Sequence, residues 1–152
     1  MTPAGHAPPA GRRVVLDTNV LLALWVFADS RYKPIRGAIN SGSWVALTDA
    51  DCLDEFERVL GYPEFRLDAQ AQHAVLDDYL GIAHRVPKGP WMALPQCADP
   101  DDQKFVELAC SGAADCIVTS DKALLKLGRH RTIAQKLALR IIPPQRFIED
   151  HL

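Results

Sequence analysis

Four acidic residues could act together in chemistry although they lie far apart in the sequence: Asp17, Glu55, Asp102 and Asp121. Asp17 and Asp121 each follow a short run typical of a buried strand, and ligands of parallel sheets bind beyond the carboxyl ends of the strands. Asp102 falls in the first turn of an expected helix, and Glu55 lies at the margin of another helix's apolar stripe. Converging carboxylates repel one another and need a counter-cation. Their hard oxygen atoms suit Mg²⁺ or Mn²⁺, so the sequence predicts a metal site.

Each of these acids also has an ordinary structural explanation when it is taken alone. Asp17 and Asp121 could be turn residues or helix caps, and Asp102 could be a partner of a helix dipole. Glu55 could be a surface residue of its helix. Only the convergence of all four favours a metal site. Other catalytic patterns are missing from the sequence, because it has no phosphate-binding P-loop, no G-x-S-x-G elbow and no H-x-x-x-H zinc spacing.

The hydrophobic pattern predicts strands that alternate with helices. Four short apolar runs are typical of buried strands: 12–16, 44–47, 116–119 and 139–142. Helices are expected over 17–28, from 29 or 30 to about 41, over 48–60, 68–84 and 99–112, around 124–127, and from about 145. Thr48, Asp68 and Asp99 are expected caps, and the Pro-rich stretch 87–98 is an expected loop.

This alternation determines the expected fold. Strands joined through helices predict a central, mostly parallel sheet with helices on both faces. The fold class is therefore α/β, a three-layer α/β/α sandwich. With 152 residues, the chain is expected to form a single domain over 12–152. It would follow a disordered leader over 1–11, which is rich in Pro, Ala and Gly.

Composition favours a cytoplasmic protein. Apolar residues make up 48% of the chain and charged residues 24%, as in soluble globular domains. The longest apolar run, 20–28, is about half of what a membrane-spanning helix needs, and 1–11 lacks the features of a secretory signal. The four cysteines fit neither a zinc pair nor a dense disulfide framework. We therefore expect a reduced protein without a membrane partner.

The formal net charge of −2 conceals an uneven distribution. From 122 to 148 there are seven basic residues and no acidic one: Lys122, Lys126, Arg129, Arg131, Lys136, Arg140 and Arg146. They could form a solvated helical face, or a strip that contacts the phosphates of a nucleic acid. The candidates for RNA binding directly follow the last proposed ligand and are Lys122, Lys126, Arg129 and Arg131.

Four motifs together resemble those of the PIN-domain ribonucleases. They are D-T-N in VVLDTNVLLAL, L-x-E-x in LDEFERVL, D-x-x-[FI] in DPDDQKFVELA and V-T-x-D in GAADCIVTSDKALL. The resemblance covers roughly 13–147 and is greatest to the bacterial branch of toxins from toxin–antitoxin systems, the relatives of VapC toxins. It implies a compact α/β/α sandwich that cleaves single-stranded RNA with Mg²⁺ or Mn²⁺ as cofactor.

The resemblance also implies roles for individual residues and a set of partners. The family's four acids carry over as Asp17 in D-T-N, Glu55 in LDEF, Asp102 in DQKF and Asp121 in VTSD. Asn19 matches an asparagine that organises the site by hydrogen bonding. Asp99 matches an acid that adds a further candidate ligand, and Asp115 matches another acid common in this branch. The implied partners are an RNA substrate, a cognate antitoxin protein and a second copy of the chain in a homodimer.

The expected reaction is attack on phosphorus by a metal-bound water, with the same metal or a second one stabilising the transition-state charge. Two alternatives stay open. A non-catalytic RNA-binding or regulatory domain would keep the fold without cleaving RNA. A metal-dependent phosphatase with Asp17 as its nucleophile is disfavoured, because the D-x-D pattern of haloacid-dehalogenase-like phosphatases is absent at 17–19.

Overall fold

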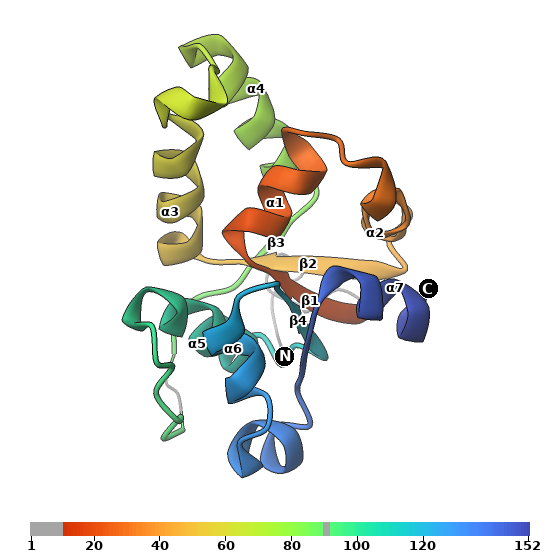
Figure 1. Cartoon of the computed structure of the whole chain (residues 1–152), viewed down its shortest axis with the longest axis vertical. Coiled ribbons are helices and arrows are strands. Elements are labelled where there is room, and N and C mark those ends of the chain that lie inside the picture. Colours follow the sequence, from red (N-terminus) through yellow and green to blue (C-terminus); the bar gives the residue numbers. More distant parts are fainter. Residues whose placement is uncertain (1–10, 90–91) are drawn as a thin grey trace, which may run out of the picture.

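A single parallel sheet forms the centre of the molecule. The computed structural model describes residues 11–89 and 92–152, so most of the expected leader lies outside the described residues. The strands have the order β3-β2-β1-β4-β5, and every neighbouring pair is parallel (Figure 1). They are β1 (Arg12–Leu16), β2 (Trp44–Thr48), β3 (His84–Arg85), β4 (Cys116–Val118) and β5 (Arg140–Ile142). The predicted α/β class with a parallel central sheet is confirmed.

Helices cover both faces of this sheet because successive strand residues point to opposite sides. Val14 and Leu16 belong to one core cluster, and Val15 between them belongs to the other. The first cluster draws on α1 (Thr18–Trp25), α2 (Lys33–Asn40), α3 (Ala50–Leu60), α4 (Ala69–Leu80) and α7 (Pro144–His151). The second draws mainly on α5 (Gln103–Ser111) and α6 (Lys122–Leu127). The result is the expected three-layer sandwich (Figure 1).

Several element boundaries differ from the sequence predictions. The first helix ends at Trp25 rather than near Ala28, and the backbone of Ala28 is left-handed, with φ 47°. Asp49, not Thr48, caps α3, since Thr48 is still the last residue of β2. The helix expected to reach His84 ends at Leu80, and His84 begins the short strand β3.

Short turns of tighter or wider helix connect these elements. Three 3₁₀ turns are η2 (Ser30–Tyr32), η3 (Pro63–Phe65) and η4 (Pro100–Asp102), and a π-helical turn, η5, spans Thr132–Lys136. The last was not predicted. The final helical turn expected from about 145 is instead the eight-residue helix α7.

The strand order reverses between β1 and β4. From β1 the chain proceeds to β2 and β3 on one side, then returns to β4 and β5 on the other. In parallel sheets, the crevice at the carboxyl ends of the strands that flank such a reversal is the usual place for a ligand. Asp17 follows β1 directly, and Asp121 lies three residues beyond β4.

Two further expectations concern the chemistry of the chain as a whole. Cys52, Cys97, Cys110 and Cys116 are free cysteines, as the reduced interpretation requires. Over 11–89 and 92–152, no helix combines the length and the apolar character needed to cross a bilayer.

Candidate active site

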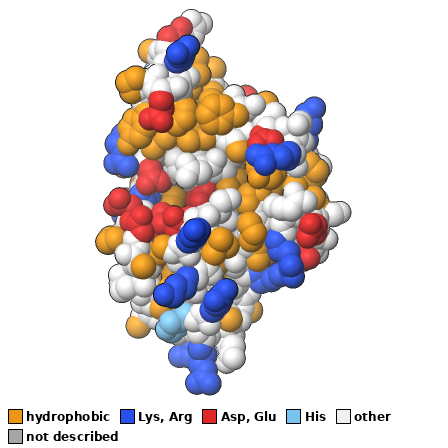
Figure 2. Space-filling view, in the orientation of Figure 1, with side chains coloured by type: hydrophobic (Ala, Val, Ile, Leu, Met, Phe, Trp, Pro, Cys, Tyr) orange, Lys and Arg blue, Asp and Glu red, His pale blue; other side chains and the backbone are white. Residues whose placement is uncertain are grey.

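An open cleft of about 440 Å³ lies at the sheet edge where the strand order reverses. The four predicted acids all line it, and so do Asp99 and Asn19. Its other lining residues include Thr18, Arg58, Tyr62, Glu64, Phe65 and Asp101. Acidic side chains gather in a compact group on this face of the molecule (Figure 2). Residues from four separate parts of the sequence therefore share one solvent-accessible space.

Asp17 is held firmly at the floor of the cleft. Its Oδ1 accepts a hydrogen bond from the Val20 N–H at 2.9 Å and thereby caps α1, and its Oδ2 accepts one from the Thr119 hydroxyl. Only 5% of the residue is exposed. Burial raises the pKa of Asp17, the two hydrogen bonds lower it, and the nearby Asp121 and Glu55 carboxylates raise it further.

Asp121 has the same local role one strand further along the sheet. Its Oδ2 accepts the Leu124 N–H at 3.0 Å and caps α6, while its own N–H donates to Thr119 Oγ1 at 2.9 Å. Thr119 therefore links both strand-end acids, because its hydroxyl donates to Asp17 and accepts from Asp121. This fully buried threonine connects the Asp17 carboxylate to the backbone of Asp121.

Asp102 combines a raised pKa with a carboxylate oxygen that has no hydrogen-bond partner among the described residues. It is half-buried at the end of η4, and its Oδ2 atom is buried without a hydrogen-bond partner among the described residues. Burial raises the pKa of Asp102 to about 7, with further contributions from a hydrogen bond to Asp121 and from the charges of Asp121, Asp99 and Asp17. A cation beside this unpartnered oxygen would stabilise the folded protein, because the neighbouring carboxylates carry the same negative charge.

Glu55 reaches the cleft from α3 and is already paired. Its Oε2 accepts a hydrogen bond from the Thr18 hydroxyl, and its Oε1 accepts one from Lys104 Nζ at 2.6 Å. The Lys104 and Glu55 side chains are only 19% and 14% exposed, so the pair is largely shielded from water. Arg58 lies on the outer side, with its guanidinium 3.9 Å from Oε1. The fourth acid is thus neutralised by a cation of the chain itself.

The donor set fits a divalent metal ion in its chemistry. Asp17, Asp102 and Asp121 offer hard carboxylate oxygens, and burial, with a further contribution from the neighbouring carboxylate charges, raises the pKa of both Asp17 and Asp102. Within 11–89 and 92–152, no three acidic, histidine or cysteine side chains are grouped closely enough to form a complete metal site. The cleft brings the acids together, and a bound cation would compensate the unpartnered Oδ2 of Asp102.

The model of the PIN domain matches residues 13–123, a span that includes all four acids. The chain belongs to the PIN-domain family. PIN domains are generally nucleases and typically use divalent metal ions. No curated protein matches the chain.

The other residues that the PIN-domain resemblance implied occupy different places. Asp99 lines the cleft and caps η4 by accepting the Asp101 N–H at 3.0 Å. Asn19 is exposed in the cleft and makes no side-chain hydrogen bond to the part of the chain that the structure describes, so its organising role stays a prediction. Asp115 is not in the cleft. It precedes β4 at the opposite end of the sheet, where its Oδ2 accepts the Arg13 N–H at 2.9 Å.

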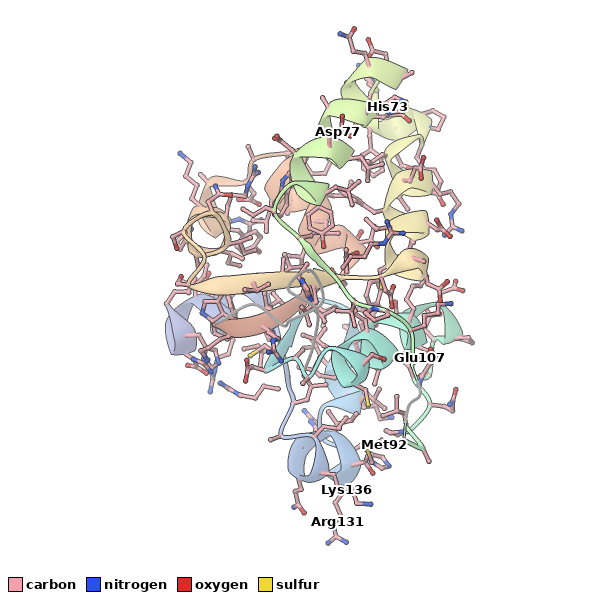
Figure 3. All side chains as sticks on the ribbon, turned by 180° about the vertical axis from the view of Figure 1, so that it is seen from behind. His73, Asp77, Met92, Glu107, Arg131 and Lys136 are labelled. Carbon is pink, nitrogen blue, oxygen red and sulfur yellow. The ribbon has the colours of Figure 1, made fainter. Side chains whose placement is uncertain are left out.

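The basic residues after Asp121 do not form one continuous strip. Lys122 and Lys126 are exposed on α6, whereas Arg131 and Lys136 lie at the far end of the molecule (Figure 3). Two of the seven are engaged elsewhere, since Arg140 and Arg146 both pair with Asp150 at 2.9 Å. In Figure 2, Lys and Arg side chains (blue) lie below the acidic group and continue toward the end of the molecule that carries Arg131 and Lys136. The RNA-binding role of Lys122, Lys126, Arg129 and Arg131 stays a prediction.

Three residues of the site were not singled out from the sequence: Thr18, Thr119 and Lys104. Thr119 stands two residues before Asp121, and a threonine that accepts the N–H of the second following residue is a recognised turn pattern that could have indicated it. Thr18 and Lys104 act on Glu55 from 37 and 49 residues away, so no local spacing could reveal them.

Replacing Lys104 by methionine is expected to lower the free energy of unfolding of the metal-free protein by about 1–3 kcal/mol, because it leaves the shielded Glu55 carboxylate without its main cation. Urea denaturation would measure this change. The matched control is Lys88→Met, which removes an equally short 2.6 Å ion pair with Asp51 whose two side chains are about half exposed. The control should be nearly neutral. Equal effects of the two substitutions would contradict the role given to Lys104.

Proposed function

We propose that this protein is a metal-dependent endoribonuclease that cleaves single-stranded RNA. The observation that carries the proposal is the gathering of Asp17, Glu55, Asp102 and Asp121 around one cleft in a PIN domain. Asp102 in particular offers a buried, unpartnered oxygen in a strongly negative surrounding. Such a site is unfavourable for an RNA phosphate on its own and becomes favourable only with a cation.

In this proposal Mg²⁺ or Mn²⁺ would be held by Asp17, Glu55, Asp102 and Asp121, with Asp99 as a further candidate ligand. When bound, the ion supplies a water of lowered pKa and compensates the charge that develops on phosphorus. The chain's own contribution is to hold the carboxylates in place through Thr119 and the two helix caps. Because the pKa of Asp102 is about 7, cation binding at neutral pH would also release a proton from this group.

The decisive experiment is cleavage of a labelled single-stranded RNA by the purified protein. Cleavage is expected with Mg²⁺ or Mn²⁺, to stop when a chelator is added in excess, and to return when the metal is restored. Duplex RNA of the same sequence is the control for strand selectivity. RNA binding without cleavage under all metal conditions would favour the non-catalytic alternative. A trapped aspartyl-phosphate on Asp17 would instead favour the phosphatase.

We further propose that the ribonuclease is the toxin of a toxin–antitoxin pair and acts in the cytoplasm, with a cognate antitoxin as its partner and a homodimer as its assembly. The support is the combination of the four motifs with the PIN-domain match. Purification from a source that carries the neighbouring genes would test it. A small protein that co-purifies and silences RNA cleavage is expected, and free, active ribonuclease would contradict the toxin role.

A further inference from the structure

Three aromatic side chains meet on the surface beside the cleft. We call Phe27, Tyr62 and Phe65 the aromatic rim. Phe27 and Phe65 have ring centroids 5.8 Å apart, and the Tyr62 and Phe65 rings are nearly parallel, at 7° with centroids 6.5 Å apart. Phe27 is 59% exposed and Tyr62 is 40% exposed. The rings therefore contact one another while keeping open faces toward water.

The aromatic rim is continuous with the acidic cleft. Tyr62 and Phe65 line the same cavity as the four acids, and a hydrophobic surface adjoins the acidic group on this face (Figure 2). Both rings follow directly after α3, the helix that carries Glu55, while Phe27 comes from the turn after α1. A ligand that reaches the carboxylates from this side must pass over the rim.

Core packing does not account for these exposed rings. Phe65 contacts the larger hydrophobic cluster, but neither Phe27 nor Tyr62 belongs to it. The other large exposed apolar side chains of the described residues, Leu80, Met92 and Leu152, are distant in the sequence and do not line the cleft. The only described site where exposed aromatic rings gather is therefore next to the acids.

We propose that the aromatic rim stacks one or two unpaired bases of the RNA beside the phosphate that lies at the acids. The inference rests on the proposed ribonuclease function and deepens it, because it explains why the substrate would be single-stranded. A base can lie flat on an exposed ring only when it is not stacked within a duplex, and each such contact is tolerant of base identity. Arg58, which lines the same cleft and has a 65% exposed side chain, is placed to contact the adjoining phosphate.

The dimensions favour a base over a protein partner. An exposed aromatic side chain offers at most about 150–250 Å² for burial, so the partly exposed rings of the rim present roughly 300 Å² together. A stable protein interface buries about 800 Å² on each side. Charged groups also border the rim, since Glu64 and Arg58 line the same cavity. One or two nucleobases match the size of this surface.

The test measures binding of a short single-stranded RNA with a cleavage-resistant phosphorothioate backbone by fluorescence anisotropy, with Mg²⁺ present and the wild-type protein as the parent. Tyr62→Ala and Phe27→Ala are each expected to weaken binding by about 5- to 100-fold, the usual effect of removing a stacking ring. Tyr62→Phe keeps the ring and should bind nearly as tightly as the parent. Leu80→Ala is the matched control, because Leu80 is also 40% exposed but lies away from the cleft. Phe65→Ala is avoided, since Phe65 also packs against the core.

A second arm places an abasic nucleotide at each position of the RNA in turn. The position that stacks on the rim should lose affinity with the parent protein and lose almost none further with Tyr62→Ala, since both changes remove the same contact. The salt dependence of binding should be unchanged by Tyr62→Ala, because stacking releases no counterions.

Unchanged affinity in both alanine variants would overturn the stacking proposal while leaving the ribonuclease function intact, provided the wild-type protein cleaves RNA. Unchanged RNA affinity with lost binding of a purified protein partner would also overturn it and would assign the rim to that partner. If the wild-type protein neither binds nor cleaves RNA, the proposed function fails, and this proposal fails with it.

Discussion

Replacing Asp102 by asparagine is expected to lower the rate of metal-dependent RNA cleavage by a factor on the order of 10³ or more. The amide keeps the size of the side chain but removes the negative charge and one anionic oxygen. The affected atom is the Oδ2 that has no partner within the described chain, so no other protein group replaces it. Single-turnover cleavage of a labelled single-stranded RNA would measure the loss.

Asp121→Asn should reduce cleavage similarly with little loss of stability, because asparagine caps a helix about as well as aspartate. Asp17→Asn should reduce cleavage similarly and keep the helix cap, but it should lose some stability, because an amide nitrogen in place of Oδ2 cannot accept the buried Thr119 hydroxyl. The matched control is Asp54→Asn, an exposed acid next to Glu55 on the same helix that does not line the cleft. It should leave the rate unchanged. Full activity of all three cleft variants would remove the basis for the metal site.

The second large effect concerns the stability of the metal-free protein and how that stability depends on pH. Asp102→Asn is expected to raise the free energy of unfolding at pH 7.5 by about 2 kcal/mol, after allowance for solvent screening of this half-buried group. The folded protein holds the Asp102 proton up to about pH 7, whereas an aspartate in the unfolded chain loses it near 3.8. Folding therefore binds a proton in this window, and wild-type stability falls as pH rises from about 4 to 7.

Urea denaturation at pH 4 and pH 7.5, with a chelator present, would test whether wild-type stability falls as pH rises. The advantage of Asp102→Asn should be present at pH 7.5 and nearly vanish at pH 4, where the wild-type carboxyl is protonated in the folded state. Added Mg²⁺ or Mn²⁺ should stabilise the wild-type protein by mass action and the variant much less. A variant that is less stable than wild type at pH 7.5 without metal would contradict the raised pKa of Asp102 and the energetic cost of its charge in the cleft.

The strand ends and helix caps could be predicted from the sequence, because they depend on residues that are close together in it. Asp17 and Asp121 could be placed at the edge of the sheet because each follows a buried β-branched run and precedes an apolar helix. In a parallel sheet the carboxyl ends of strands share one edge, so convergence followed without knowledge of the strand order. Asp68 and Asp99 were likewise predicted as caps and are caps.

Features that depend on distant contacts could not be predicted in the same way. The pairing of Glu55 with Thr18 and Lys104 depends on how α3, α1 and α5 pack, which no spacing in the sequence encodes. Strand β3 has only two residues, too few for any periodicity, and is defined by its pairing with β2. Asp115, to which the resemblance gave no role, lies outside the cleft, because β4 places it and Asp121 at opposite ends of the sheet.

Two of the carboxylates each begin a helix with one oxygen and face the cleft as well. An aspartate codon becomes an asparagine codon by a single nucleotide change, and the amide oxygen can keep the same cap. A lineage could therefore lose one of these cleft charges in a single mutational step and keep the helix cap, and the rest of the fold would survive for selection to use. Substitution by alanine at the same positions would remove the cap as well, so natural inactive descendants of such a chain should carry asparagine more often than alanine.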